Sequence, residues 1–197
     1  MSERPTRAHG PMVRTAFFDA SLVVGIGIAA ISASFAAAPG WHGVAGAMLA
    51  VIALAIAGVD RRRLIIPDQL NALAFVLGVA AASLGNLAAP GQAVLDALLR
   101  ATFMFAAFFA FRTAYRHLRG REGIGLGDVK LAAVAGSWLG WTDLPIVVDM
   151  AALSALAWVL VGRATGREWS LEEKLPFGFF FAPAIWICWL LAVRRGY

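Results

Sequence analysis

Charged side chains are scarce in this sequence: they make up 15% of its 197 residues, against about 25% in an average soluble domain. Hydrophobic residues make up 60%, and the mean hydropathy is +0.75. This composition excludes an intrinsically disordered chain, a coiled coil and a free nucleic-acid-binding domain. We therefore expect a membrane protein.

Cysteine and histidine are also rare. The single Cys188 excludes a framework of internal disulfides and a zinc site made of four cysteines. The three histidines, His9, His42 and His117, lie in separate segments. No cluster of His, Cys and carboxylates has the spacing of metal ligands, so the sequence indicates no metal site.

Long apolar runs dominate what is present. A helix needs about 20 mainly apolar residues to cross the hydrocarbon of a bilayer. We predict an all-α, polytopic membrane bundle of about seven transmembrane helices, at 17–38, 43–60, 70–89, 93–111, 128–142, 144–162 and 177–193. The short connections leave no room for a soluble domain, so residues 17–197 are expected to form one integral-membrane domain after a basic N-terminal tail at 1–16. Two glycine pairs, Gly25 with Gly27 and Gly136 with Gly140, are expected to let helices pack closely.

The positions of Lys and Arg predict the orientation, because cytoplasmic loops are enriched in them. With a cytoplasmic N-terminus, most of the 17 cations fall in cytoplasmic segments. Arg194 and Arg195 are the exception, which a re-entrant last span or one helix fewer would explain. The first span could instead be a signal sequence cleaved near Ser34–Ala36.

Charges inside spans are costly, so each one needs a reason. Asp19 begins the first span, where a carboxylate suits the positive end of the helix dipole. Asp96 and Arg100 are spaced i, i+4 and are expected to neutralise each other. Asp149 is expected to be structural or interfacial.

Asp60 and Asp128 have distinctive surroundings. Asp60 closes the apolar run Val51–Val59 and is followed by Arg61–Arg63, so it ends a helix. Asp128 follows a glycine-rich turn at 123–127 and opens a helix. The predicted topology places both at the cytoplasmic ends of their spans, where two acids at the same depth could share a water.

These segments resemble the type IV prepilin peptidases, membrane aspartic proteases of the GxGD class. Residues 60–71 (DRRRLIIPDQLN) look like the first acidic motif of that family, and residues 125–131 (GLGDVKL) look like its GxGDxKL motif. Residues 175–178 (LPFG) resemble the Pro-Phe-Gly segment that precedes the last helix. The three segments occur in the family's order, and the resemblance covers about residues 43–193.

The resemblance implies that Asp60 and Asp128 are the catalytic aspartates. Other motif residues are expected to bind substrate or to support the site: Gly125, Gly127, Lys130, Asp68, Pro176 and Gly178. The first two glycines would shape the turn that presents Asp128. Asp68 would cap a helix, and the lysine would extend to the interface.

The chain departs from the family pattern in two places. Phe179 stands where many members have a second proline, and we expect this difference to touch neither acid. The larger, bifunctional members have a cytoplasmic loop with paired cysteines and are also N-methyltransferases. No such loop is present here, so peptidase activity without methyl transfer is expected.

Hydrolysis by two carboxylates requires one ionised group to deprotonate a water and one protonated group to donate to the scissile carbonyl. Helix dipoles favour Asp128 as the base and Asp60 as the acid, whereas Arg61–Arg63 would favour the reverse. The helix that opens at Asp128 has about 15 apolar residues, about 22 Å, so it is too short for a full span. We expect its glycine-rich start to lie below the membrane surface and to line a cavity that contains water.

The resemblance implies a prepilin or pseudopilin as substrate, cut after a glycine at the end of its short basic leader, and implies no metal or organic cofactor. It also implies a multi-pass protein of a bacterial-type inner membrane, in contact with the lipid bilayer and with no nucleic acid. The oligomeric state stays open.

Two other functions also stay open. In a small proton- or cation-coupled transporter, Asp60, Asp128 and Asp149 would form a relay. In a non-enzymatic assembly scaffold, the acids would be helix caps. A nucleotide site is disfavoured, because the glycines lack the dinucleotide spacing.

Overall fold

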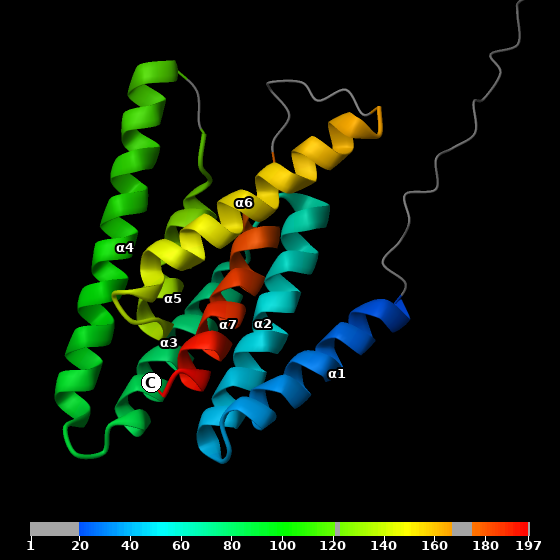
Figure 1. Cartoon of the computed structure of the whole chain (residues 1–197). Helices are drawn as coiled ribbons and strands as arrows, with labels where there is room; N and C mark the ends of the chain where they lie inside the picture. Colours follow the sequence, from blue (N-terminus) through cyan, green and yellow to red (C-terminus); the bar gives the residue numbers. More distant parts are fainter. Residues whose placement is uncertain (1–19, 121–122, 167–174, 197) are drawn as a thin grey trace, which may run out of the picture.

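The computed structural model describes residues 20–120, 123–166 and 175–196. The regular structure of this part is entirely helical, which confirms the all-α prediction (Figure 1). The helices are α1 (Ala20–Ala37), α2 (Trp41–Arg63), α3 (Asp68–Gly85), α4 (Pro90–Arg119), α5 (Leu126–Trp138), α6 (Asp143–Ala164) and α7 (Phe177–Arg194). The predicted tail at 1–16 and Asp19 lie outside the described residues.

Each predicted span overlaps one helix, but the helices differ in length. In the described part, α2, α3, α4, α6 and α7 are long and apolar enough to cross a membrane. The apolar stretch of α1 is shorter, and α5 has 13 residues, about 20 Å. Of the about seven transmembrane helices predicted, five are therefore long and apolar enough to be full spans among the described residues, and the prediction of a short helix at Asp128 is confirmed.

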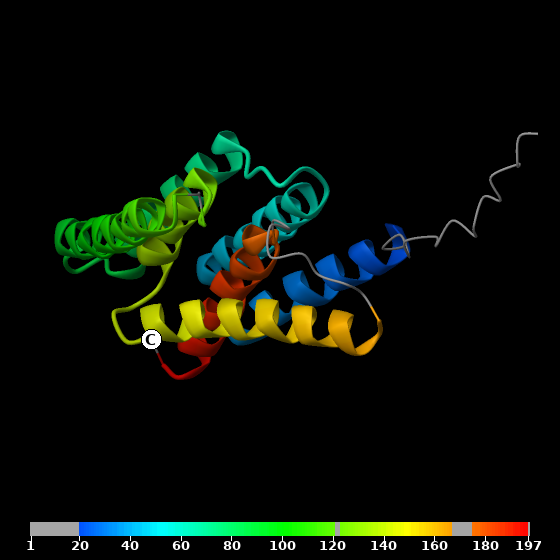
Figure 2. The same ribbon diagram turned by 90° about the horizontal axis from the view of Figure 1, so that it is seen from above.

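Helices α2, α5 and α7 form the centre of the bundle. Helix α5 packs against α3, α4 and α7, while α2 packs against α1, α3 and α7. Viewed from above, α4 and α1 lie on opposite sides, with α2 and α7 between them (Figure 2). The outer helices leave large apolar side chains exposed, such as Val76, Phe103 and Leu160. An apolar exterior of this kind is suited to lipid rather than water.

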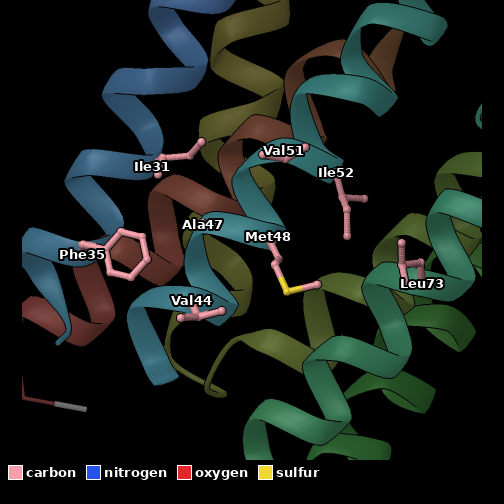
Figure 3. Close-up of a pocket in the computed structure, with 8 residues that line it drawn as sticks. All are labelled: Ile31, Phe35, Val44, Ala47, Met48, Val51, Ile52 and Leu73. Carbon is pink, nitrogen blue, oxygen red and sulfur yellow. The ribbon is translucent and has the colours of Figure 1, made fainter. Parts of the chain in front are cut away.

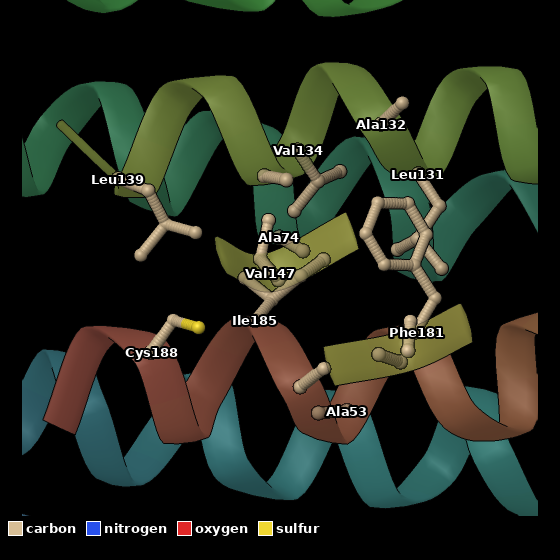
Figure 4. Packing of buried hydrophobic residues seen from close by; sticks show 14 of the residues in the cluster. Ala53, Ala74, Leu131, Ala132, Val134, Leu139, Val147, Phe181, Ile185 and Cys188 are labelled. Atoms are coloured by element: carbon tan, nitrogen blue, oxygen red, sulfur yellow. The ribbon is translucent and has the colours of Figure 1, made fainter. Parts of the chain in front are cut away.

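The core lies between α5 and α7. Leu131 and Val134 of α5 face Phe181 and Ile185 of α7, and each of these side chains is at most 1% exposed (Figure 4). Small residues bring the helices together. A Cβ added at Gly136 of α5 would lie 2.5 Å from the carbonyl oxygen of Arg100 in α4, so these two backbones pack directly against each other.

The predictions of close packing at the two glycine pairs have different outcomes. Close packing at Gly136 is confirmed. The prediction for α1 is wrong: a Cβ at Gly25 would have no atom within 4 Å, and one at Gly27 would make only an ordinary contact with Leu54. These two glycines face open space or loose packing, because α1 diverges from the rest of the bundle along its length (Figure 1).

The predicted pairing of Asp96 with Arg100 is also wrong. The Nε of Arg100 donates to the carbonyl oxygen of Gly136, 3.3 Å away, and the Asp96 side chain is exposed. The close approach of α4 and α5 brings that carbonyl within reach, so the cation is satisfied by a neighbouring helix. Asp149 is exposed on α6, and its role stays a prediction.

An ion pair joins α6 to the end of α7. Asp143 is 2% exposed, and its Oδ1 accepts a hydrogen bond from Nη1 of Arg195 at 3.2 Å. The sequence-based reasoning did not single out Asp143. This contact gives Arg195, the exception in the predicted charge distribution, a carboxylate partner.

Candidate active site

Asp60 lies in the last turn of α2, where its side chain is held by another helix. The residue is 5% exposed, and its Oδ2 accepts a hydrogen bond from the backbone N–H of Phe179 at 2.9 Å. Helix α2 ends at Arg63, and its C-cap Leu64 adopts the left-handed conformation with φ of 54° and donates its N–H to the Asp60 carbonyl. This termination places Asp60 beside the first turn of α7.

Asp128 lies in the first turn of α5. Its Oδ2 accepts a hydrogen bond from the N–H of Gly125, the N-cap residue, at 3.2 Å. The preceding turn is tied to α4, because Nη1 of Arg112 donates to the carbonyl oxygen of Ile124 at 2.6 Å. The aspartate is half-buried, whereas Gly125 and Leu126 are exposed, so the turn lies at the edge of the bundle.

The fold brings these two acids together. Ile66 packs between the segments that carry them: a Cβ at Gly127 would lie 3.0 Å from Ile66 Cβ, and one at Gly178 would lie 2.6 Å from Ile66 Cδ1. Three motifs far apart in sequence therefore meet at one end of the bundle.

Both carboxylates accept hydrogen bonds at helix N-termini. The sequence-based argument placed Asp60 at the negative end of its own helix, but its carboxylate faces the positive end of α7. Asp128 sits at the positive end of α5. Backbone N–H groups at a helix start favour negative charge at both positions. Helix dipoles therefore do not distinguish the acid from the base.

The expectation that Phe179 touches neither acid is wrong, since its N–H binds Asp60. A proline has no N–H and could not make this bond. Gly178, at the start of α7, also has little room for a side chain, because a Cβ there would lie 3.0 Å from Asp60 Oδ2. Pro176 is the N-cap of α7, with φ of −71°.

Asp68 does not cap a helix. It is the first residue of α3, after the N-cap Pro67, and no side-chain cap bond is formed there. Its Oδ1 lies 2.7 Å from Nζ of Lys130, which joins α3 to α5. The side chains are 69% and 38% exposed, so the ion pair contributes about 1 kcal/mol or less.

Asn71 is a site residue to which sequence reasoning assigned no role. It is 4% exposed, and its Nδ2 donates to the carbonyl oxygen of Gly127 at 3.4 Å. Its Oδ1 is buried and has no hydrogen-bond partner among the described residues. Asn71 follows Asp68 at i+3 on α3, and this spacing is the signal that places both on the face toward α5.

Arg61 follows Asp60 and packs against aromatic rings. Its guanidinium lies 5.3 Å from the Phe179 ring centroid and 5.5 Å from that of Trp158 in α6. Distances of this size are typical of cation–π contacts. Sequence reasoning did not single out Trp158.

An apolar groove of about 370 Å³ lies away from the acids, between α1 and α2 with one residue of α3 (Figure 3). Its lining is Ile31, Phe35, Val44, Ala47, Met48, Val51, Ile52 and Leu73. Across the described ranges, no three His, Cys, Asp or Glu side chains gather where they could hold a metal ion.

Comparison with known proteins identifies the family. The model of the type IV leader peptidase family matches residues 47–160, more than half of the chain and a region that includes both acids. The chain belongs to the type IV leader peptidase family. Pro176 and Gly178 lie beyond the matched residues of this leader peptidase family model.

Among similar proteins, the prepilin leader peptidase/N-methyltransferase of Aeromonas hydrophila is 32% identical over 169 residues, covering 85% of this chain and 57% of the relative. That of Burkholderia pseudomallei strain K96243 is 38% identical over 145 residues, covering 71% and 45%. Leader peptidase HopD of Escherichia coli is 44% identical over 89 residues, covering 45% and 57%. The chain thus spans about half the length of these leader peptidase relatives. No solved structure matches it.

Proposed function

We propose that this chain is a membrane-embedded aspartic endopeptidase that removes the short basic leader of a prepilin or pseudopilin. The observation that carries the proposal is the meeting of Asp60 and Asp128, both within the family match, on segments that pack against the same Ile66 side chain at one end of a helical bundle. Membership of the leader peptidase family and the names of its relatives support the substrate class.

The chemistry is general acid–base hydrolysis. Two neighbouring carboxylates do not both ionise easily, so the pair holds one proton. The ionised member takes a proton from a water, whose oxygen adds to the scissile carbonyl carbon, while the protonated member donates to the carbonyl oxygen. The tetrahedral diol then collapses: the carboxyl group that took the proton of the water gives it to the amine nitrogen, the other carboxylate takes a proton from a diol hydroxyl, and the carbon–nitrogen bond breaks to release an amine and a carboxylic acid.

The geometry fits such a dyad. Each aspartate has one oxygen anchored by a backbone N–H, from Phe179 for Asp60 and from Gly125 for Asp128. Anchoring restricts the rotation of each carboxylate and fixes the direction of its second oxygen. Helix α5 is too short to span the bilayer, so its exposed glycine-rich start provides irregular backbone where water and an extended peptide can enter.

We place this site at the cytoplasmic face of the inner membrane, with a cytoplasmic N-terminus. Helices α2, α4 and α6 end on the side of the bundle that carries Asp60 (Figure 1). Their last turns carry Arg61–Arg63 in α2, Arg116 and Arg119 in α4, and Arg163 in α6. Positive residues favour the cytoplasmic side. A leader cut there would be one that precedes an apolar helix entering the membrane.

The test is cleavage of a purified prepilin by the purified chain in detergent, followed by the mobility shift of the pilin on a gel. Wild type is expected to cut the substrate. Asp60→Asn and Asp128→Asn are each expected to lower kcat about 10³-fold or more, because each removes one member of the acid–base pair. Asp149→Asn is the matched control, since this exposed acid lies outside the pair.

The assay also separates the alternatives. An ion transporter would not cut a peptide in detergent, where no ion gradient exists. A scaffold with capping acids would tolerate both substitutions. Full cleavage by either Asp60→Asn or Asp128→Asn would remove that residue from the mechanism, provided that both proteins elute as folded monodisperse species.

A further inference from the structure

Phe179 binds two consecutive residues of α2 through two different groups. Its backbone N–H donates to Oδ2 of Asp60 at 2.9 Å, across 119 positions of sequence. Its ring centroid lies 5.3 Å from the guanidinium carbon of Arg61. One residue of α7 therefore holds both the last-turn carboxylate of α2 and the cation beside it.

The hydrogen bond gives an acceptor to a backbone N–H at the start of α7. The first N–H groups of a helix have no partner within that helix, and they are usually satisfied by a polar side chain at the N-cap. Here the N-cap is Pro176, which has no side-chain acceptor, and no cap bond is formed locally. Phe179 is the third residue of α7, so its N–H is one of these groups, and Asp60 supplies the missing acceptor from another helix.

The cation–π contacts of Arg61 also hold the end of α2 against its neighbours. Arg61 lies over two rings, from Phe179 in α7 and Trp158 in α6, so the end of α2 is held against both helices. Phe179 also packs edge-to-face on Phe180, with centroids 4.9 Å apart. Rotation of the α2 terminus would have to break the hydrogen bond and the cation–π contact together.

We propose that Phe179 is a positioning residue for Asp60: its N–H holds one carboxylate oxygen and thereby aims the other at the peptide. The inference rests on the proposed peptidase function. It assigns to Phe179 a role in the chemical step rather than in substrate binding. The effect of losing the N–H should therefore fall on kcat, with KM nearly unchanged.

The experiment compares variants that separate the N–H from the ring. Replacing Phe179 by its α-hydroxy acid, through nonsense suppression, turns the N–H into an ester oxygen and keeps the ring. Phe179→Leu removes the ring and keeps the N–H. Phe180→Leu is the matched control, because it removes a neighbouring ring from the same turn and leaves the Asp60 bond intact.

We expect the ester variant to lower kcat about tenfold or more, as for a lost hydrogen bond to a charged group, with KM within about twofold of wild type. Phe179→Leu should retain a higher kcat than the ester variant, and Phe180→Leu should match wild type. A wild-type kcat in the folded ester variant, or a loss confined to KM, would overturn the inference.

The same set of kinetic measurements also tests the proposed peptidase function. If wild type does not cut, or if Asp60→Asn cuts as well as wild type, the proposed function fails. If wild type cuts and Asp60→Asn is inactive while the ester variant has wild-type kcat, only the role of Phe179 fails.

Discussion

Nζ of Lys130 lies 2.7 Å from Oδ1 of Asp68, so an ion pair joins the two acidic motifs across 62 positions of sequence. The pair is one of three polar links between α3 and α5. The others are Asn71 Nδ2 to the Gly127 carbonyl and Trp138 Nε1 to the Ala74 carbonyl, the latter at 2.9 Å. These contacts fix the helix that carries Asp128 against the helix that follows Asp60.

The first prediction concerns this ion pair. Asp68→Asn, Lys130→Gln and the double variant should lower the free energy of unfolding by about the same small amount, 1 kcal/mol or less, because the exposed pair is lost in all three. Thermal unfolding in detergent measures the stability, and peptidase kinetics measure KM. An increase in KM in Lys130→Gln that Asp68→Asn does not share would show that Lys130 binds substrate instead.

A second prediction concerns Gly178. A Cβ there would lie 2.6 Å from Ile66 Cδ1 and 3.0 Å from Asp60 Oδ2, so Gly178→Ala should destabilise the fold by about 1–3 kcal/mol and lower kcat. Adding Ile66→Val removes the nearest atom and should restore part of the loss in Tm. Gly58→Ala in α2 is the control, because a Cβ at that position would meet nothing within 4 Å. No recovery in the double variant would contradict this account of the packing.

A third prediction concerns Asn71. Its bond to Gly127 is long at 3.4 Å, and its Oδ1 is buried without a described partner. Asn71→Leu should therefore leave the Tm unchanged or raise it, since a buried polar atom is removed. The kcat should fall several-fold because the peptide unit before Asp128 is less firmly held. Gln69→Leu, an exposed position on α3, controls for added apolar surface. A fall in Tm that accompanies the fall in kcat would indicate that Asn71 has a purely structural role.

A fourth prediction concerns the buried Asp143 and its partner. Arg195→Gln should lower the free energy of unfolding by about 1–2 kcal/mol, less than for a fully buried pair because Arg195 is half exposed. Asp143→Asn should cost less, since it removes the buried charge itself. Arg194→Gln is the matched control for loss of a cation. Thermal unfolding in detergent tests the order, and equal Tm values for all three would contradict it.

Much of the bundle could be predicted from the sequence. The seven apolar segments, the short helix after the glycine turn and the position of both acids at helix ends all follow from local patterns of hydropathy, glycine and charge. The family resemblance also rests on contiguous motifs, and the family match confirms it. The roles proposed for Asp60 and Asp128 stay predictions until the cleavage assay is done.

The errors arose where the partner of a side chain lies on another helix. Asp96 with Arg100 is a sound local pair, but in the folded bundle the guanidinium donates to the carbonyl of Gly136 on another helix. Asp68 has the residue type of a cap, yet Lys130 of α5 takes its carboxylate. Phe179 carried no polar signal, because the group that it offers to Asp60 is its backbone N–H.

The sequence by itself determined which segments form helices and which end of each helix carries an acid, because hydropathy, turns and caps act over a few neighbouring residues. Only the tertiary structure decided that Asp60 accepts a hydrogen bond at the start of α7, that Ile66 separates Gly127 from Gly178, and that Asp143 meets Arg195. These contacts depend on how helices pack against one another, and small residues such as Gly136 set that packing through distances of closest approach.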